Sequence, residues 1–344
     1  MSSQTPAADN PTRCAVIGAG SFGTCLAILL AERQYAVDLW ARDPEVAKTI
    51  NRDRSNPRYL KDFRLPERVR ATTSLEEALH RKEVVLSVVP SHGVRKVWTQ
   101  AARFIEPGAL LVTTSKGIEP GSCKLMHEVL EEIVGPGQGQ RIVALSGPSF
   151  AREIAEGRPT AVTVAARDET YAIAAQAILS SPLFRCYSNT DILGVELCGA
   201  LKNVIAIAIG ICDGMALGEN ARASLITRGL RELTRLGTEL GAHPLTFLGL
   251  SGIGDLILTC TGDLSRNRSV GLEIGRGKKV KEALQGLSQV AEGVRTAESA
   301  YRLSRRHDVD MPITQGVYQV LYEGRDFREA ASDITSRQLK SEFE

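Results

Sequence analysis

Near the start of the chain, an apolar strand, a glycine loop, a helix and a second strand follow one another within about thirty residues, the span of a dinucleotide-binding unit. The strands are expected at residues 14–17 and 35–40, and the loop between the first strand and the helix is Gly18-Ala19-Gly20-Ser21-Phe22-Gly23. The first glycine permits a tight turn, the second lets the backbone approach a pyrophosphate, and the third lets the helix pack closely. The start of the helix adds N–H groups and the positive end of a dipole. The segment therefore predicts a dinucleotide site.

The residue that ends the second strand of such a unit reads the adenosine ribose. A site for NAD alone places an acidic residue there, whereas this chain has Ala41-Arg42-Asp43. Arg42 can hold a 2′-phosphate, so we expect NADPH to be favoured and NADH to be tolerated. Asp43 is either a ribose ligand or the N-cap of a helix that begins at Pro44.

Later strand-like runs alternate with segments of helical length, which favours a largely parallel, doubly wound sheet covered on both faces. They lie at residues 84–89, 110–114, 142–145, 161–165 and 184–187. Because ligands of such sheets bind beyond the carboxyl ends of the strands, the residues that follow these runs are candidate site residues. Lys116 is one of them, and a cation there faces the cofactor. His92 is another, but a single histidine in a proline-bounded turn is left out of the catalytic set.

The stretch at residues 194–213 is apolar on almost every face of a helix, which predicts a helix buried inside the protein. It contains Lys202, whose helical neighbours include the small residues Gly199, Cys198 and Ala206. Burial disfavours the charged form of a lysine and lowers its pKa, which makes it able to exchange protons near neutral pH. The alternative is a lysine that extends to the surface or pairs with a carboxylate such as Glu196.

From the turn-and-cap cluster at residues 188–191 onward, no further strand is expected. The second domain is thus predicted to be all-helical. Beyond the lysine-bearing helix, helices are predicted at residues 221–240, 268–274, 280–285, 295–305, 313–321 and 327–335.

A glycine-rich segment, GLSGIGDL, and the sequence SRNR lie between two of these helices. The glycines permit a close turn that can aim Asp255 inward, and Ser265 is a good N-cap for the helix that follows. Backbone N–H groups at that helix start, together with Arg266 as a charge-assisted fork, make a candidate phosphate site. The alternative is a capped surface helix with solvated arginines.

A chain of 344 residues is long enough for two domains. Its 42 Lys and Arg against 40 Asp and Glu give no support for a nucleic-acid or anionic-membrane surface, so a small-molecule partner is expected. Seven cysteines without CxxC pairs fit a reducing cytoplasm. There is no basic-then-apolar leader, and Lys202 and Asn203 interrupt the longest apolar run, so neither a signal peptide nor a membrane span is expected. No metal site is expected, and a homodimer is plausible.

From Val16 to about Val320 the chain resembles the NAD(P)-dependent glycerol-3-phosphate dehydrogenases of the bacterial type. The resemblance rests on ten motifs in one order: GAGSFG, LWARD, VVPSH, TSKGIE, SGPSFA, ALKNVIAIAIGICDG, NARASLITRGLRE, GLSGIGDLILTCTG, SRNRSVG and VAEGVRT. It implies a Rossmann-like domain at residues 12–189 and an all-helical domain at 190–336, similar to the C-terminal domain of 6-phosphogluconate dehydrogenase. Residues 1–11 and 337–344 are expected to be tails.

The family's reaction is the reversible reduction of dihydroxyacetone phosphate to sn-glycerol 3-phosphate, a phospholipid precursor, with NADPH or NADH. By this resemblance Lys202 is the proton donor and acceptor, supported by Lys116 and Asp255. The expected cofactor contacts are Gly18, Gly20, Ser21, Phe22, Gly23, Arg42, Lys116, Ala151, Arg266, Val290 and Glu292. The expected substrate contacts are Lys116, Gly147, Ser149, Lys202, Asp255, Ser265, Arg266 and Asn267.

Two other functions remain open at this point. A dehydrogenase for an unphosphorylated or carboxylate-bearing substrate would share the dinucleotide loop and a helical lysine, but it has no need of the SRN sequence after the glycine turn. A protein that binds NADPH without turnover would need neither Lys202 nor Lys116. Turnover of dihydroxyacetone phosphate distinguishes these possibilities.

Overall fold

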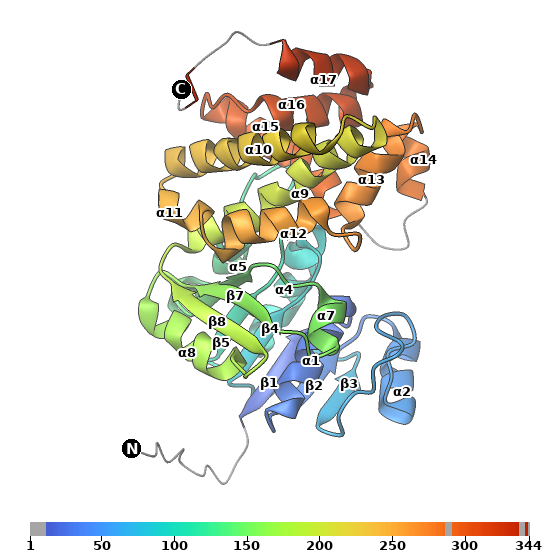
Figure 1. Cartoon of the computed structure of the whole chain (residues 1–344). Coiled ribbons are helices and arrows are strands. Elements are labelled where there is room, and N and C mark those ends of the chain that lie inside the picture. Colours follow the sequence, from blue (N-terminus) through green and yellow to red (C-terminus); the bar gives the residue numbers. More distant parts are fainter. Residues whose placement is uncertain (1–11, 286–290, 337–340, 343–344) are drawn as a thin grey trace.

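The computed structural model describes residues 12–285, 291–336 and 341–342 of the chain. It has an N-terminal Rossmann-like domain built on one sheet and a C-terminal domain of helices stacked on it (Figure 1). The predicted cofactor residue Val290 lies outside the described residues, as do most residues of the two expected tails.

The sheet of the N-terminal domain has eight strands in the order β3-β2-β1-β4-β5-β6-β7-β8. All neighbouring pairs are parallel except β6 and β7, which are antiparallel. The prediction of a largely parallel sheet is confirmed, although β3 was not predicted. The strands are β1 (Arg13–Ile17), β2 (Ala36–Trp40), β3 (Val69–Thr72), β4 (Val84–Ser87), β5 (Leu110–Thr113), β6 (Ile142–Ser146), β7 (Thr160–Ala165) and β8 (Phe184–Asn189).

Helices cover both faces of this sheet, each over its own hydrophobic core, so the sheet is doubly wound as predicted. One face is covered by α1 (Ser21–Glu32), α2 (Pro44–Asp53) and α8 (Glu169–Leu179). The other is covered by α3 (Leu75–Leu79), α4 (Val94–Ala101) and α5 (Met126–Val134). The remaining helical segments of this domain are η1 (Ser91–Gly93), η2 (Ala102–Phe104), α6 (Pro136–Gly139) and α7 (Ala151–Ala155).

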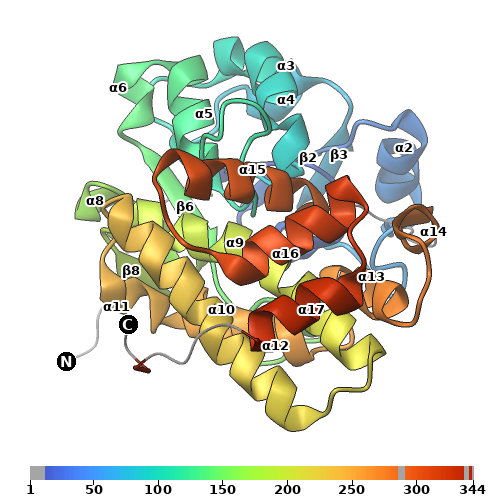
Figure 2. The same cartoon turned by 90° about the horizontal axis from the view of Figure 1, so that it is seen from above.

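The C-terminal domain is organised around α9 (Ile192–Gly214), which is buried along nearly its whole length. The other helices surround it, with α15 to α17 nearest the viewer in Figure 2. The predicted helices are all present within a few residues, whereas the glycine-rich segment forms additional helical turns. The helices are α10 (Glu219–Glu239), α11 (Pro244–Phe247), η3 (Leu250–Gly254), α12 (Asp255–Thr261), α13 (Arg266–Gly275), α14 (Val280–Gln285), α15 (Glu292–Arg306), α16 (Pro312–Tyr318), η4 (Gln319–Glu323) and α17 (Phe327–Thr335).

Glycines let α9 and α13 touch along their backbones. A Cβ atom at Gly271 would lie 2.0 Å from the carbonyl oxygen of Ile207, and one at Gly275 would lie 2.3 Å from that of Ile211. A side chain at either position would force the helices apart. Further along α9, Asp213 forms ion pairs with Arg222 of α10 and Arg268 of α13. These contacts hold α13 against the second half of α9.

The two domains are joined by a buried pair between α9 and α5. The Glu196 carboxylate accepts hydrogen bonds from the backbone N–H of His127 (3.1 Å) and lies 2.7 Å from its Nδ1. Burial alone lowers the pKa of His127, but the Glu196 carboxylate, with smaller contributions from Glu128 and Glu131, outweighs burial and the net pKa is raised. Glu196 is therefore engaged with His127; Lys202 does pair with a carboxylate, but the partner is Asp255 and not Glu196.

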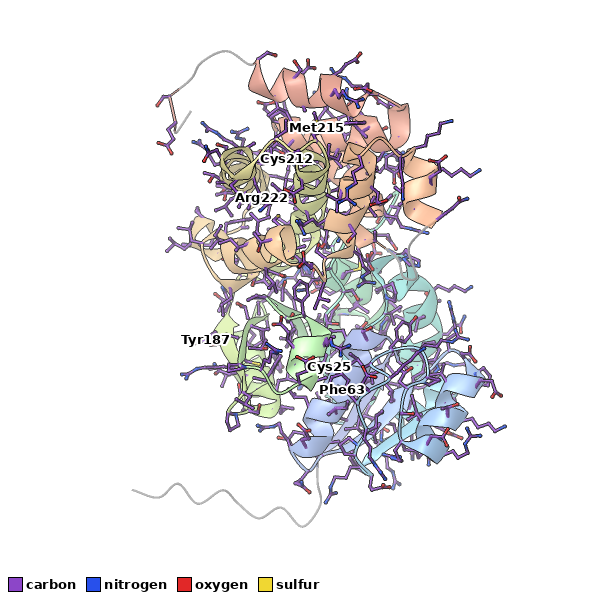
Figure 3. All side chains as sticks on the ribbon, turned by 45° about the vertical axis from the view of Figure 1, so that its right-hand side comes forward. Cys25, Phe63, Tyr187, Cys212, Met215 and Arg222 are labelled. Carbon is purple, nitrogen blue, oxygen red and sulfur yellow. The ribbon has the colours of Figure 1, made fainter. Side chains whose placement is uncertain are left out.

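The cysteines behave as small apolar residues, as predicted. All seven are unpaired and buried, in both domains (Cys25 and Cys212 in Figure 3). Burial raises the pKa of Cys14, Cys25 and Cys260 to about 12, so their thiols stay neutral.

By length and composition alone, α9 and the segment from Pro244 to Thr261 are apolar enough to cross a membrane. In the structure α9 is a core helix, and 89% of its most apolar stretch is buried inside the protein. The second segment is not one straight helix, because Gly252 between α11 and α12 has non-helical angles (φ −85°, ψ −105°). Both segments are parts of the folded helical domain.

Candidate active site

Five loops meet at one edge of the sheet. Ile17 pairs with Trp40 on one side and with Ser87 on the other, and Ser87 pairs with Thr113, so β1, β2, β4 and β5 end together. β6 ends at the same edge, since it is parallel to β5. The edge therefore collects the glycine loop, Arg42, the Ser91 turn, Lys116 and the segment that begins at Gly147.

The glycine loop has the shape that a dinucleotide pyrophosphate requires. Gly18 has φ +124°, and a Cβ atom there would lie 2.5 Å from the carbonyl oxygen of Val88. A Cβ atom at Gly23 would lie 1.8 Å from the carbonyl oxygen of Gly18, whereas the Cβ position of Gly20 has no described atom within 4 Å. The first and third glycines are thus needed for packing, and the second leaves room for a ligand to approach.

The start of α1 adds to this fit. Within the described part of the chain no side chain caps it, and its first turn, which begins at Ser21, holds no acidic residue. Its first N–H groups and the helix dipole can therefore meet a pyrophosphate. Phe22, the next residue, is half-buried beside the loop.

Arg42 and Asp43 follow β2 at the same edge. Arg42 is exposed. Desolvation and then the positive charge of Arg295 lower the pKa of His92 in the neighbouring turn, with Glu292 opposing and Arg42 adding a smaller effect. Asp43 accepts a hydrogen bond from the backbone N–H of Glu45 (2.9 Å), so it is the N-cap of α2. Of the two alternatives for Asp43, the structure supports the N-cap.

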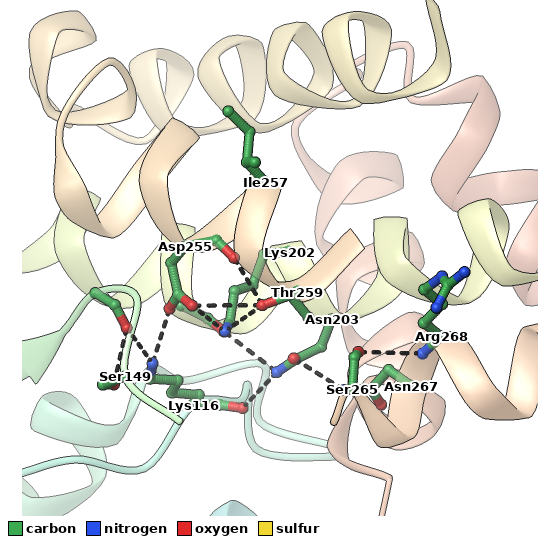
Figure 4. A network of polar contacts seen from close by, with 12 residues as sticks. Lys116, Ser149, Lys202, Asn203, Asp255, Ile257, Thr259, Ser265, Asn267 and Arg268 are labelled. Carbon is green, nitrogen blue, oxygen red and sulfur yellow. Dashed lines mark hydrogen bonds and ion pairs between the residues drawn. The ribbon is translucent and has the colours of Figure 1, made fainter. Parts of the chain in front are cut away.

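Two lysines share one buried carboxylate between the domains (Figure 4). Asp255, at the start of α12, is 1% exposed and accepts from Lys202 through one oxygen (2.5 Å) and from Lys116 through the other (2.7 Å). Lys202 also lies 2.7 Å from the hydroxyl oxygen of Thr259, which in turn donates to the carbonyl oxygen of Asp255. Lys116 comes from the sheet edge, whereas Lys202 and Asp255 come from the helical domain.

The electrostatics of this cluster differ between its members. Burial lowers the pKa of Lys202 to about 8, with Asp255 opposing the shift and Lys116 adding to it. Burial by itself raises the pKa of Asp255, but the ammonium groups of Lys116 and Lys202 outweigh burial and the net pKa is lowered. The carboxylate therefore stays ionised, while Lys202 can gain or lose a proton near neutral pH.

The segment after β6 faces this cluster. Gly147, in the left-handed region with φ +141°, presents its carbonyl oxygen to Lys116 (3.0 Å) and to the hydroxyl of Ser149 (2.9 Å). A Cβ atom at Gly199, one turn before Lys202 on α9, would lie 2.7 Å from Oγ of Ser146. Ala151 begins α7 directly after this segment.

A chain of amide contacts links three helices of the second domain. Asn203 of α9 accepts from Asn267 of α13 (2.9 Å), and the side-chain oxygen of Asn267 accepts from the backbone N–H of Gly293 on α15 (2.9 Å). Asn203 also donates to the carbonyl oxygen of Gly199 (3.2 Å). The predicted residue Asn267 is thereby held beside the lysine cluster.

The start of α13 has the predicted cap. Ser265 is buried, and its hydroxyl oxygen accepts from the backbone N–H of Arg268 (3.3 Å). Arg266 is exposed to solvent, yet enough protein surrounds it that desolvation lowers its pKa, with Glu292 opposing. A cation in these surroundings next to a helix start is suited to bind an anion.

Glu292 connects the second domain to the sheet edge. It lies at the start of α15, and its carboxylate accepts from the backbone N–H (3.1 Å) and the hydroxyl of Ser91. A Cβ atom at Gly117 would meet both Ser91 (2.5 Å from Oγ) and Glu292 (3.2 Å from Oε2). The predicted residues Glu292 and Lys116 are thus neighbours across the domain boundary.

Thr259 and Asn203 were not among the predicted site residues. Thr259 is one helical turn after Asp255, so a polar residue four positions beyond an inward carboxylate was an available signal. Asn203 follows Lys202 directly in an otherwise apolar helix, and a buried amide needs partners. Neither signal identifies which residue Thr259 or Asn203 contacts in the folded protein. His92 makes no recorded hydrogen bond to the lysine cluster among the described residues.

Comparison with known proteins gives consistent matches along the chain. Residues 13–172 match the family described as NAD-dependent glycerol-3-phosphate dehydrogenase N-terminus, and residues 191–332 match the corresponding C-terminus. A protein of Citrifermentans bemidjiense named glycerol-3-phosphate dehydrogenase [NAD(P)+] is 51% identical over 96% of this chain and 98% of its own length. The protein of the same name from Syntrophobacter fumaroxidans is 48% identical over 96% of this chain and 97% of its own.

Solved structures agree with these matches. The crystal structure of a glycerol-3-phosphate dehydrogenase from Coxiella burnetii superposes with a TM-score of 0.90 at 39% sequence identity. It covers 95% of this chain and 99% of its own.

Proposed function

The chain belongs to the NAD-dependent glycerol-3-phosphate dehydrogenase family, and from that premise we propose how its residues divide the work. The enzyme interconverts dihydroxyacetone phosphate and sn-glycerol 3-phosphate with NAD(P) as the cofactor. The observation that carries the residue assignment is the single buried carboxylate of Asp255, shared by Lys202 and Lys116.

In this proposal Lys202 is the proton donor for reduction and the proton acceptor for oxidation. When bound, the nicotinamide supplies or accepts the hydride at the substrate's second carbon. Negative charge develops on the carbonyl oxygen during reduction, and an ammonium group can both stabilise that charge and provide the proton. Asp255 orients Lys202, and Lys116 adds a second positive charge. The negative charge of Asp255 also offsets part of the repulsion between the two ammonium groups.

The cofactor is proposed to lie along the carboxyl edge of the sheet. The glycine loop and the start of α1 would hold the pyrophosphate, and Arg42 the 2′-phosphate of NADPH. Further proposed cofactor contacts are Lys116, Ala151, Arg266, Glu292 and Val290, of which Val290 lies outside the described residues.

The phosphorylated substrate is proposed to lie between the lysine cluster and the start of α13. Ser265 and Arg266 would bind the phosphate, with N–H groups of the helix start as further donors. Gly147, Ser149 and Asn267 would line the same space, since they contact or adjoin the lysine cluster.

Several broader expectations belong to this proposal. We place the division between the two domains at residues 189 and 190, because β8 ends and α9 is capped there by Asp191. The relatives are metabolic enzymes by name, which supports a cytoplasmic role that supplies glycerol phosphate for phospholipids. A homodimer is compatible with this proposal.

Oxidation of NADPH in the presence of dihydroxyacetone phosphate is the direct test. Purified protein should consume NADPH with this substrate, and it should be much less active with a 3-hydroxy acid in the oxidative direction. Binding of NADPH without turnover of any of these compounds would contradict the proposal.

Arg42 should decide how well the enzyme distinguishes its two cofactors. Arg42→Ala is expected to raise the KM for NADPH about tenfold, as the loss of one charge-assisted hydrogen bond does, and to leave the KM for NADH nearly unchanged. Steady-state kinetics with each cofactor measure both values. Equal losses with NADPH and NADH would show that Arg42 does not read the 2′-phosphate.

The two directions of the reaction should respond oppositely to pH. Reduction needs protonated Lys202 and oxidation needs neutral Lys202, whose pKa is lowered to about 8. The kcat/KM for reduction should therefore fall as the pH rises through about 8, while the kcat/KM for oxidation rises. Profiles of kcat/KM measured in both directions test this. Profiles that change in the same sense would rule out Lys202 as the titrating group.

A further inference from the structure

The connection between α2 and β3 is tied to the glycine loop through a buried amide. Asn56 is fully buried, and its Nδ2 donates to the carbonyl oxygen of Ala19 (3.0 Å) and contacts Oγ1 of Thr24 (2.8 Å). Its Oδ1 accepts from the backbone N–H groups of Arg58 (3.0 Å) and Tyr59 (3.1 Å). Both ends of the amide are used, so the backbone of Arg58 has a fixed position beside the dinucleotide loop.

The side chain of Arg58 returns to the end of β2. Its guanidinium forms an ion pair with Oδ2 of Asp43, while Oδ1 of Asp43 caps α2. Asp43 is the residue after Arg42. The guanidinium of Arg58, from the α2–β3 connection, is therefore placed near Arg42, the arginine that the sequence assigns to the 2′-phosphate.

We propose that Arg58 is a second ligand of the 2′-phosphate of NADPH, alongside Arg42. This rests on the proposed use of the β2 end as the adenosine site. The α2–β3 connection then becomes part of the surface that distinguishes NADPH from NADH.

Charge and exposure support this role. The 2′-phosphate carries close to two negative charges, and a lone Asp43 carboxylate beside it would repel it. Arg58 neutralises that carboxylate, and a guanidinium has five N–H donors in a planar fork, so one edge can hold Asp43 while others face a phosphate. The Arg58 side chain is 59% exposed, so a ligand can reach it. NADH has no group to use these donors.

Binding of nucleotide fragments tests the proposal without any turnover. Adenosine 2′,5′-bisphosphate and 5′-AMP are titrated calorimetrically into the wild type and Arg58→Ala. The variant should lose about tenfold in affinity for the bisphosphate and less than about twofold for 5′-AMP, as expected for one charge-assisted contact. Arg52→Ala is the matched control, since Arg52 is also an exposed arginine paired with an aspartate, Asp53. It should change neither affinity.

A second pair of variants separates direct contact from neutralisation of Asp43. In an Asp43→Asn background, Arg58→Ala should still weaken bisphosphate binding severalfold. If it has no effect there, Arg58 acts only by cancelling the charge of Asp43, and the proposal is overturned. Equal losses for both nucleotides in the single variant would overturn it as well, because they would reflect a disturbed loop.

The proposed NADPH site can fail separately. If the wild type binds 5′-AMP as tightly as the bisphosphate, the 2′-phosphate is not recognised, and both the Arg42 and the Arg58 assignments are wrong. If Arg42→Ala abolishes the preference for the bisphosphate and Arg58→Ala leaves it intact, only the inference on Arg58 is overturned.

Discussion

Lys202→Met should lower kcat by about a hundredfold or more, which is the usual effect of losing a general acid–base group. The side chain of Lys202 is 8% exposed, and its ammonium contacts Asp255 and Thr259. Methionine fills a similar volume but can neither carry the proton nor stabilise the charge on the substrate oxygen. NADPH binding should persist, because the proposed cofactor residues lie mainly at the sheet edge. Stopped-flow measurement of NADPH oxidation and fluorescence titration of NADPH give the two quantities.

The control for Lys202→Met must distinguish loss of the proton-transfer group from loss of protein stability. Removing one partner of a buried ion pair can destabilise a protein by roughly 3–5 kcal/mol, although Asp255 here keeps Lys116 as a partner. Thermal unfolding of the variant should therefore accompany the kinetics. Lys124→Met removes a lysine from a more exposed pair with Glu132 and should leave kcat unchanged. A folded Lys202→Met variant with a third of the wild-type kcat would show that another group supplies the proton.

Arg266→Ala should lower kcat/KM for dihydroxyacetone phosphate by an amount equivalent to about 2–4 kcal/mol of transition-state stabilisation. This is the range for losing a charge-assisted contact that is desolvated in the complex. The arginine stands at the start of α13, where desolvation lowers its pKa and Ser265 caps the helix. Binding energy from a phosphate remote from the reacting carbon can position that carbon for reaction, so kcat should fall as well as affinity. Steady-state kinetics with dihydroxyacetone phosphate measure the loss.

Unphosphorylated dihydroxyacetone provides the comparison for Arg266→Ala. It should be a very poor substrate for the wild type, and its kcat/KM should fall far less in the variant than that of dihydroxyacetone phosphate. Added phosphite should improve its use by the wild type and not by the variant. Arg276→Ala is a matched control, because Arg276 follows the other end of α13 in an exposed pair with Glu273. Equal losses on both substrates at saturating NADPH would mean that Arg266 does not act through the substrate phosphate, which would then bind elsewhere.

Local sequence was sufficient to predict the parts of this protein that depend on neighbouring residues. The glycine loop, the N-caps at Asp191 and Ser265, and the buried character of α9 all follow from spacing within a few residues, whereas the N-cap at Asp43 was one of two alternatives. Alternation of apolar runs with helical segments gave the doubly wound sheet. The edge strand β3 was missed because its short sequence VRAT carries an exposed arginine and lacks a clear apolar run.

Only the tertiary structure decided which residues meet across long sequence distances. That Asp255 binds both Lys202 and Lys116, and that Glu196 instead binds His127, depends on how α9, α12 and α5 are placed against one another. Periodicity specifies which face of a helix is buried, but not which carboxylate on another helix will be opposite it. The glycine contacts between α9 and α13 and the antiparallel β7 are further features of this kind. The sequence by itself therefore determined the elements and the chemical groups, while their pairing was settled by packing, because the low dielectric interior requires every buried charge to find a partner.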